Sequence, residues 1–315
     1  MSIDPEPRRA SSFYVAAAAL ELFGSMVQAQ AVPDSLKSSL QTFKETRSVC
    51  SSSVVDVHAR GAYFRKIQSE PSESAVGVTG RPILPQVAVD PKRMMPSRAG
   101  DPAWWAGPLD RPSVYLGAAA PGIEVDAGLS WERVVDAQGK LTDAYGFRPF
   151  WRVTRGGKSV FGPPPEEAAK PVYQPGQALT MTLTLVADDR LELSISGAGA
   201  PSYSTAFAAP GLPLDGAGRP RSFKRVNAID QYRRDAAGDR HGNEGFDAAP
   251  TAASALGGSW ASAGVLTDAG YAQPLFGGSC RVVLSPDRAS TAPPAVTASS
   301  PHKSGGETVD LAPGR

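Results

Sequence analysis

Residues 122–131 read GIEVDAGLSW and carry the clearest two-residue period in the chain. The odd-numbered positions from Ile123 to Trp131 are apolar and share one face of an extended strand, whereas Glu124 and Asp126 lie on the other face. A strand of this kind buries its apolar face against a core and leaves the other face polar. The stretch therefore predicts a half-buried strand, whose two carboxylates either do chemistry or simply face water.

Other segments show related patterns, and each predicts a strand. The first is FRPFWRVT at 147–154, where Pro149 favours an edge or a bulge. Next come ALTMTLTLV at 178–186 and LELSIS at 191–196, which predict a hairpin across the turn ADDR. The last are SFKRVNAIDQY at 222–232 and the late runs GSWASAGVL and GSCRVVL. The segment 222–232 also fits helical spacing, but its β-branched residues favour a strand. Several strands with one apolar face each are best buried by stacking two sheets. We predict an all-β fold, a two-sheet antiparallel β-sandwich of jelly-roll type, over residues 113–285.

The first 31 residues have the layout of a secretory signal. Two arginines precede an apolar run at 13–27, and small residues end at Ala31. Glu21 inside the run leaves open an N-terminal helix on a cytosolic protein. The run is too short to span a bilayer, so we predict no permanent membrane segment. Residues 1–31 thus indicate a signal peptide and a secreted or periplasmic protein.

Two further regions look irregular. Residues 32–112 are rich in proline and serine and predict an irregular N-terminal segment wrapping the core, and residues 286–315 predict a disordered tail. The chain has two cysteines, Cys50 and Cys280, without metal-type spacing. In an oxidising compartment they predict one disulfide; in a cytosolic protein they would be two unrelated thiols.

Charge and composition exclude some partners. Lys and Arg number 32 against 31 Asp and Glu, so no bulk positive field indicates nucleic acid. No metal site is predicted and no cofactor is expected. One loop, DAAGDRHGNEG at 235–245, has oxygen ligands that could hold Ca²⁺, but its glycine is misplaced for the twelve-residue calcium loop, and we favour a plain polar turn.

The acidic strand, the hairpin and FKRVNAIDQ, in that order, resemble the jelly roll of the concanavalin-A-like lectin and glucanase superfamily over residues 113–285. Laminarinase-type hydrolases of this superfamily carry ExDxE on a strand. Glu124 and Asp126 match its first two positions, but Gly128 stands at the third. A retaining glycosidase needs two carboxyl groups about 5–5.5 Å apart, and this departure removes the acid/base partner.

Two other enzyme classes share part of this pattern. The late strand resembles FKxGxYxQ of alginate-type lyases at Phe223 and Lys224, with Gln231 displaced by one residue. A lyase needs a base and cations that neutralise the uronate carboxylate, roles open to Lys224 or Tyr232 and to the cations of the strand 147–154. Glutamic peptidases pair a Glu with a Gln; Glu124 and Gln231 offer these residue types in reversed order.

The leading hypothesis is a secreted carbohydrate-recognition protein that binds a polysaccharide or glycan. Its predicted ligand-binding residues are Glu124, Asp126, Arg148, Arg152 and Gln231. The chief alternative is a polysaccharide-cleaving enzyme, a lyase or a glycoside hydrolase, with Glu124, Lys224 and Tyr232 as catalytic candidates. A third is a cell-surface structural protein in which the arginines merely pair with the carboxylates across the sheet.

Overall fold

The computed structural model describes residues 52–55, 61–96, 106–163, 170–215, 219–234, 240–241, 248–270, 272–275, 280–285, 296–299 and 304–314. All of them belong to one unit, Val32–Arg315. These residues form strands, turns and irregular chain, and none of them forms a helix of the length and apolarity needed to cross a membrane. The all-β prediction is confirmed.

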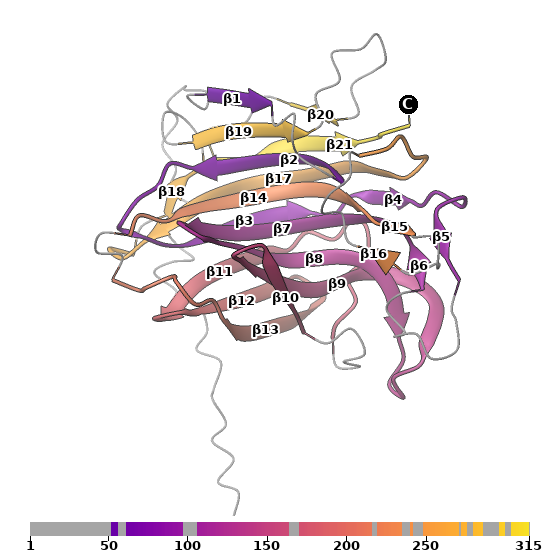
Figure 1. The fold of residues 1–315 in the computed structure, drawn as a ribbon, viewed down its shortest axis with the longest axis horizontal. Helices are drawn as coiled ribbons and strands as arrows, with labels where there is room; N and C mark the ends of the chain where they lie inside the picture. The colour runs from indigo at the N-terminus through magenta and orange to yellow at the C-terminus, as the bar shows by residue number, and fades with distance from the viewer. Residues whose placement is uncertain are drawn as a thin grey trace, which may run out of the picture. The chain divides into compact units, whose positions relative to one another are not determined.

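The strands form two sheets that overlap in Figure 1. Sheet A has the order β1-β19-β2-β14-β7-β8-β9-β10, and sheet B has the order β13-β12-β11-β3-β17-β21-β20, with β4 and β18 also paired to β17. The bounds in sheet A are β1 Ser52–Val55, β2 Ala62–Ser69, β7 Asp110–Ala120, β8 Ile123–Val135, β9 Leu141–Arg155, β10 Lys158–Gly162, β14 Ser222–Gln231 and β19 Cys280–Ser285. Those in sheet B are β3 Ala75–Ile83, β4 Gln86–Ala88, β11 Thr180–Ala187, β12 Arg190–Gly197, β13 Ala200–Ala208, β17 Ser254–Thr267, β18 Ala272–Pro274, β20 Val296–Ala298 and β21 Glu307–Leu311. Two short pairs, β5 Met94–Met95 with β6 Gly107–Pro108 and β15 Arg233–Arg234 with β16 Arg240–His241, lie outside these sheets.

The core between the sheets follows the predicted alternation. On β8, Ile123, Val125, Ala127 and Leu129 are buried, and Trp131 packs against the same core while remaining partly exposed. The predicted inward residues of β11 and β12, Met181, Leu183, Leu185, Leu191, Leu193 and Ile195, complete the core from sheet B. The predicted hairpin is confirmed, and Asp189 turns it with a φ of 56°. The predicted strands therefore bury their apolar faces between the two sheets of a β-sandwich.

Residues 222–231 form β14, which confirms the strand interpretation of the ambiguous segment. Its odd-numbered side chains, such as Phe223 and Ile229, face the core, and its even-numbered ones, such as Lys224, face outward. On β9, Pro149 lies beyond Trp151, the last residue paired with β10. That stretch of β9 has β8 as its ladder partner, so a proline is tolerated there.

The structure differs from the sequence prediction on both sides of residues 113–285. β2 and β3 lie inside the two sheets, where an irregular wrapping segment was expected. β20 and β21 add to sheet B, where a disordered tail was expected. Buried area explains the difference: Tyr63 and Ile67 of β2 and Val78 of β3 belong to the buried core residues.

Three predicted features fall outside the described residues. They are the signal peptide at 1–31, Cys50, and most of the loop at 235–245. β1 runs parallel to β19, with Ser52 opposite Arg281. In the sequence, Cys50 comes two residues before Ser52, and Cys280 comes one residue before Arg281. The disulfide stays a prediction.

A buried ion triad ties the two sheets together. Glu307 of β21 accepts hydrogen bonds from Arg65 of β2, with Nη2 to Oε2 at 2.6 Å, and from Arg225 of β14, with Nη1 to Oε1 at 2.8 Å. The glutamate side chain has no exposed surface. The Arg225 guanidinium also lies 5.6 Å from the ring centroid of Trp260. The sandwich thus holds, between its sheets, a charged cluster that the sequence patterns did not indicate.

Candidate functional site

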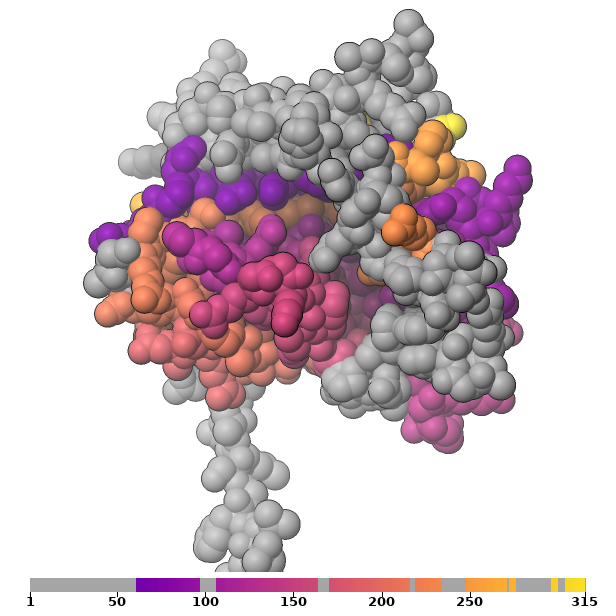
Figure 2. All heavy atoms as spheres, in the orientation of Figure 1, coloured from indigo at the N-terminus to yellow at the C-terminus, as the bar shows by residue number. Residues whose placement is uncertain are grey.

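The outer face of sheet A, opposite the core, carries the charged side chains. Strand register places one residue from each of six strands in a transverse row: Phe161, Arg152, Asp126, Gly117, Lys224 and Gln68. Figure 2 shows indigo, magenta and orange segments, far apart in the chain, sharing one surface of the molecule. Pairing in one sheet therefore brings together residues as far apart in the chain as Gln68 and Lys224.

Lys224 is the centre of this row. Its Nζ lies 2.7 Å from Asp126 Oδ1, donates to Glu124 Oε1, and lies 5.9 Å from the ring centroid of Tyr115. The side chain reaches β8 by crossing β7 at Gly117, where an added Cβ would lie 2.4 Å from Lys224 Cε. A glycine is thus required at the crossing point for the lysine to reach both carboxylates.

Asp126 is almost fully buried and has cations on two sides. The Arg152 guanidinium donates to Asp126 Oδ2, with Nε at 3.1 Å, from the neighbouring strand β9. Burial alone would raise the pKa of Asp126, but Lys224 and Arg152 outweigh it and hold the pKa well below its usual range. Burial likewise opposes charge on Lys224, yet the two carboxylates raise its pKa. The lowered pKa of Asp126 and the raised pKa of Lys224 both favour the charged forms, so these ion pairs oppose a role for Lys224 as a base.

Asp230 has the opposite environment on the same face. Ser113 Oγ donates to Asp230 Oδ2 at 2.9 Å, and burial raises the pKa of Asp230 despite the Arg152 charge. Tyr115 lies between these groups, and burial together with the Asp126 charge raises its pKa well above its usual value. The face thus keeps its tyrosine neutral and one carboxylate weakly acidic.

Acid should weaken the fold through Asp126. A carboxyl group whose pKa is lower in the folded state contributes stability that is complete above its unfolded pKa and is lost as the pH falls toward the folded value. Between pH 5 and pH 2, urea unfolding should show that Asp126→Asn loses less stability than the unchanged protein, by about 2 kcal/mol. Equal losses in the two proteins would contradict the assigned charge state.

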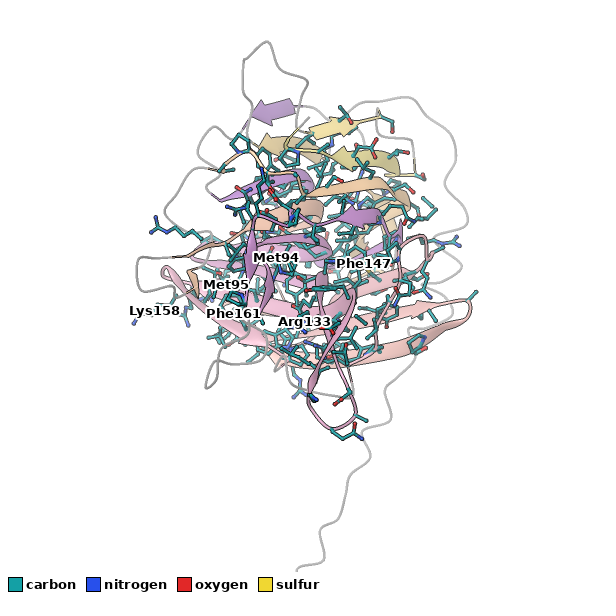
Figure 3. The ribbon with its side chains drawn as sticks, turned by 90° about the vertical axis from the view of Figure 1, so that its right-hand side faces the viewer. Met94, Met95, Arg133, Phe147, Lys158 and Phe161 are labelled. Carbon is teal, nitrogen blue, oxygen red and sulfur yellow. The ribbon has the colours of Figure 1, made fainter. Side chains whose placement is uncertain are left out.

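A second cluster, which we call the arginine recess, lies farther along the same face. A small recess is lined by Ala106, Arg111, Glu132, Arg133, Val135, Leu141 and Arg148. Glu132 Oε1 lies 3.6 Å from Arg111 Nη1, and its Oε2 lies 4.0 Å from Arg148 Nη1. Arg133, labelled in Figure 3, donates to Thr142 O and to the exposed Asp143, both at 2.8 Å. Arg148 therefore belongs to this recess and not to the row around Lys224.

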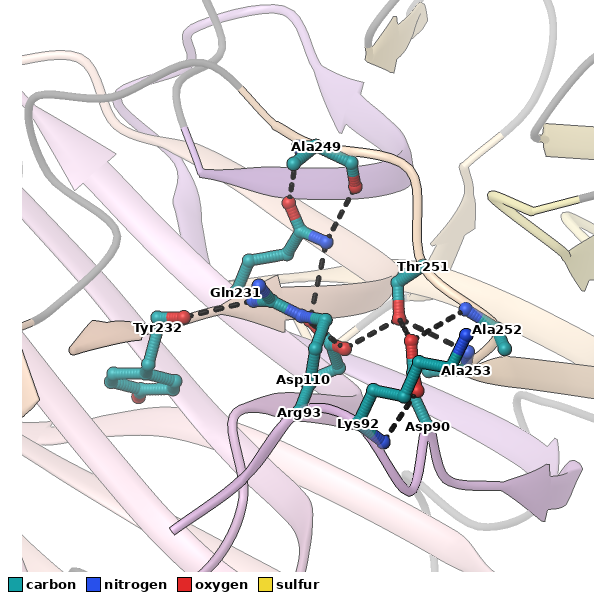
Figure 4. Close-up of polar contacts among 10 residues, drawn as sticks. All are labelled: Asp90, Lys92, Arg93, Asp110, Gln231, Tyr232, Ala249, Thr251, Ala252 and Ala253. Carbon is teal, nitrogen blue, oxygen red and sulfur yellow. Dashed lines mark hydrogen bonds and ion pairs between the residues drawn. The ribbon is translucent and has the colours of Figure 1, made fainter.

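Gln231 does not reach the outer face. Its Nε2 donates to Asp110 Oδ1 at 3.1 Å and to Ala249 O at 2.8 Å, and its Oε1 accepts from Ala249 N at 2.7 Å (Figure 4). The same network includes Thr251, whose Oγ1 donates to Asp110 Oδ2 at 2.6 Å. Because Gln231 lies on the inner side of β14, the structure does not bring it together with Glu124. Neither the predicted ligand-binding role of Gln231 nor a Glu–Gln pair has support here.

Tyr232 lies at the far end of β14 from Lys224. Its ring is 5.4 Å from the guanidinium carbon of Arg111, and Arg93 donates to its carbonyl at 2.9 Å. Eight residues of strand separate Tyr232 from Lys224, about 26 Å at the usual rise. The two lyase candidates thus contact different clusters.

Sequence reasoning missed Phe161, Gly117, Arg111 and Glu132. Phe161 lies in the short segment KSVFG, which has no clear period, and Glu132 continues the alternation of GIEVDAGLSW beyond the residues considered. Extending that period by two residues would have placed Glu132 on the outer face. Among the described residues, no group of three or more His, Cys, Asp or Glu side chains is arranged to hold a metal ion.

Comparisons with known proteins find similarity in architecture alone. No family model matches the sequence, and a search of curated proteins finds no match. A scytalido-glutamic peptidase structure with a transition state analog inhibitor covers 80% of this chain and 100% of its own, at 11% identity and a TM-score of 0.46. SCP-B, a member of the Eqolisin family of peptidases, covers 80% of this chain and 100% of its own, at 10% identity and a TM-score of 0.42. The alginate lyase from Klebsiella pneumoniae covers 59% of this chain and 66% of its own, at 11% identity and 0.24. At such identities and TM-scores, these likenesses assign no activity to this chain.

Proposed function

We propose that this protein binds carbohydrate on the outer face of sheet A, at the corner formed by β8, β9 and β10. The observation that carries the proposal is Phe161, which is 64% exposed and is the register partner of Arg152. An exposed aromatic ring offers a flat apolar surface for the C–H face of a sugar. The adjacent Arg152 guanidinium and the exposed Glu124 carboxylate offer hydrogen bonds to its hydroxyl groups.

Polar groups surround this ring. Glu124 keeps 51% of its side chain exposed although it pairs with Lys224. Thr154 Oγ1 and Ser159 Oγ lie 2.8 Å apart in the next transverse row, beside Glu124. Ion pairs hold Arg152 and Glu124 in fixed positions, which reduces the side-chain entropy lost when a ligand binds. A rigid polar surface beside an exposed aromatic ring suits recognition of a sugar.

Binding without turnover is expected. The lyase alternative needs a base, and Lys224 is held as a cation between Glu124 and Asp126. The glycosidase alternative needs a second carboxylate at position 128, where the chain has glycine. A secreted or periplasmic location with a Cys50–Cys280 disulfide accompanies this proposal.

The test is a glycan array followed by titration of the best ligand. Phe161→Ala should weaken binding about tenfold, because stacking on an aromatic ring contributes on the order of 1 kcal/mol beyond its buried area. Val160→Ala is the matched control, since Val160 is 62% exposed on the same strand but on its other side. New reducing or unsaturated ends in the same mixtures would show an enzyme instead. Equal affinity for the two variants would remove Phe161 from the site and with it the proposal.

A further inference from the structure

The last two strands, β20 and β21, form a small unit at one end of sheet B. β21 pairs with β17 on one side and with the short β20 on the other, and β20 ends the described strand order of this sheet (Figure 1). The buried Val309 and Leu311 pack with Ile229 and Ala255 in a cluster separate from the main core. No residue of β20 or β21 belongs to the main core. The unit can therefore open at its ladder with β17 while the main core stays packed.

Charged hydrogen bonds join this unit to sheet A. Glu307 lies between Arg65 of β2, at 2.6 Å, and Arg225 of β14, at 2.8 Å, measured between side-chain oxygen and nitrogen. Arg225 Nε also donates to the carbonyl oxygen of Gly305, just before β21, at 3.0 Å. The three side chains of the triad are at most 8% exposed. Residues 304–314 are therefore held to sheet A by buried hydrogen bonds that depend on the charge of one carboxylate.

The triad has two positive charges and one negative charge. Among the described residues, the charged groups that act on Glu307 are Arg65 and Arg225; on β17 its register partner is Trp260, which does not titrate. Burial opposes the charge of Glu307, but Arg225 and Arg65 outweigh it and lower its pKa. Arg225 Nη2 is buried and has no hydrogen-bond partner among the described residues. The balance of charge between the sheets thus depends on Glu307 remaining ionised.

Protonation of Glu307 would reverse the sign of the interaction. Two guanidinium groups would then face each other where little water screens them, and arginine cannot lose its proton to relieve the repulsion. Undocking of β21 lets water hydrate both cations. A carboxyl group with a lowered folded pKa contributes stability fully above its unfolded pKa, about 4.3 for glutamate, and this contribution is lost as the pH falls toward the folded value. Acid therefore weakens the docking of β21.

We propose that residues 304–314 form an acid-released strap, which is docked on β17 at neutral pH and undocks when Glu307 is protonated. β20 leaves with the strap, because β21 is its described ladder partner. The remaining strands stay paired, since their main core contains no residue of the strap. The corner proposed for carbohydrate binding lies on β8, β9 and β10, at the other end of the strand order of sheet A from β2. The strap is thus independent of the proposed function.

Hydrogen–deuterium exchange, followed as protection factors of backbone amides, tests the strap. At about pH 7, Glu307→Gln imitates the protonated state, and protection of residues 307–311 should fall at least about tenfold, while that of β11 changes less than about twofold. In the unchanged protein, the same residues should lose at least about tenfold protection between about pH 6 and pH 3.5. Asp310→Asn is the matched control on the same strand. Its side-chain oxygen can still accept from Gly257 N, as that of Asp310 does at 2.6 Å, so protection should not change.

Each result supports or overturns the strap. Unchanged protection of residues 307–311 in Glu307→Gln would overturn it, and so would an equal fall in β11, which would show that the whole sandwich opens. An equal fall in Asp310→Asn would also contradict it, because β21 would then respond to the loss of either carboxylate. If Glu307→Gln does not fold, the pH series on the unchanged protein decides: loss of protection in residues 307–311 before β11 supports the strap, and simultaneous loss or none overturns it.

Discussion

Glu307→Gln should destabilise the protein by about 3–5 kcal/mol, the largest loss expected from a single conservative change. The substitution keeps the size of the side chain but removes the negative charge that Arg65 and Arg225 share. Both guanidinium groups lie inside the sandwich, where an unbalanced charge is costly because little water reaches it. Urea unfolding followed by intrinsic fluorescence would measure the loss, with Trp260 as a reporter beside Arg225.

Asp143→Asn is the matched control for this experiment. It also removes a carboxylate from an arginine, since Asp143 accepts from Arg133 at 2.8 Å, but Asp143 is fully exposed. Solvent screens such a pair, so no resolvable change in unfolding is expected. Equal urea midpoints for Glu307→Gln and the unchanged protein would mean that Glu307 does not pair with the two arginines in solution.

The second large effect is expected from Gly128→Ala. An added Cβ at this position would lie 2.5 Å from Cα of Tyr115 and 2.6 Å from the carbonyl oxygen of Val114. These are backbone atoms of β7, so the two strands would have to separate where they pair. We expect a loss of at least about 3 kcal/mol, at the upper end for overpacking. The same contact explains why a glucanase-type glutamate cannot stand third in this ExDxG stretch without moving β7.

Gly122→Ala separates crowding from backbone strain. Gly122 turns the β7–β8 hairpin with a φ of 82°, and an added Cβ there meets nothing within 4 Å. Its substitution should cost about 1–2 kcal/mol from the left-handed backbone alone. In thermal unfolding, Gly128→Ala should therefore have a lower midpoint temperature than Gly122→Ala. The reverse order would show that β7 and β8 yield easily.

The predicted parts of the fold are those in which the two-residue period stands unbroken. β8, β11 and β12 alternate apolar and polar residues, and the structure buries the apolar side of each. β3 escaped notice because Gly77 and Gly80 take positions that a side chain cannot: an added Cβ at Gly80 would lie 2.6 Å from the Trp260 ring. β2 and β21 escaped notice because their inward residues include Arg65 and Glu307. Arg65 and Glu307 pair with each other between the two sheets, so each strand has a charged residue at an inward position. The apolar alternation that indicates a strand is therefore interrupted in both sequences.

The sequence predicted which face of its strand each candidate residue occupies, because alternation along a strand decides the direction of its side chains. Glu124, Asp126 and Arg152 were expected on one face; in the structure Lys224 bridges the two carboxylates and Arg152 pairs directly with Asp126. Gln231 was included although strand parity places it opposite Lys224, and the structure places it in the network of Figure 4. The position of each side chain along the length of the sheet was not predictable, because it depends on the register between strands that are far apart in sequence. Arg148 and Arg152 therefore looked equivalent, yet they belong to different clusters.

The order of synthesis gives the ion triad a further consequence. Arg65 and Arg225 are made long before Glu307, and domains begin to form as the chain emerges. Among the residues that the structure describes, Glu307 is the carboxylate that pairs with both cations, so we expect the space around them to stay hydrated until β21 docks. We therefore expect β21 to dock late in folding, and a nascent chain halted before it to keep a hydrated edge between its sheets.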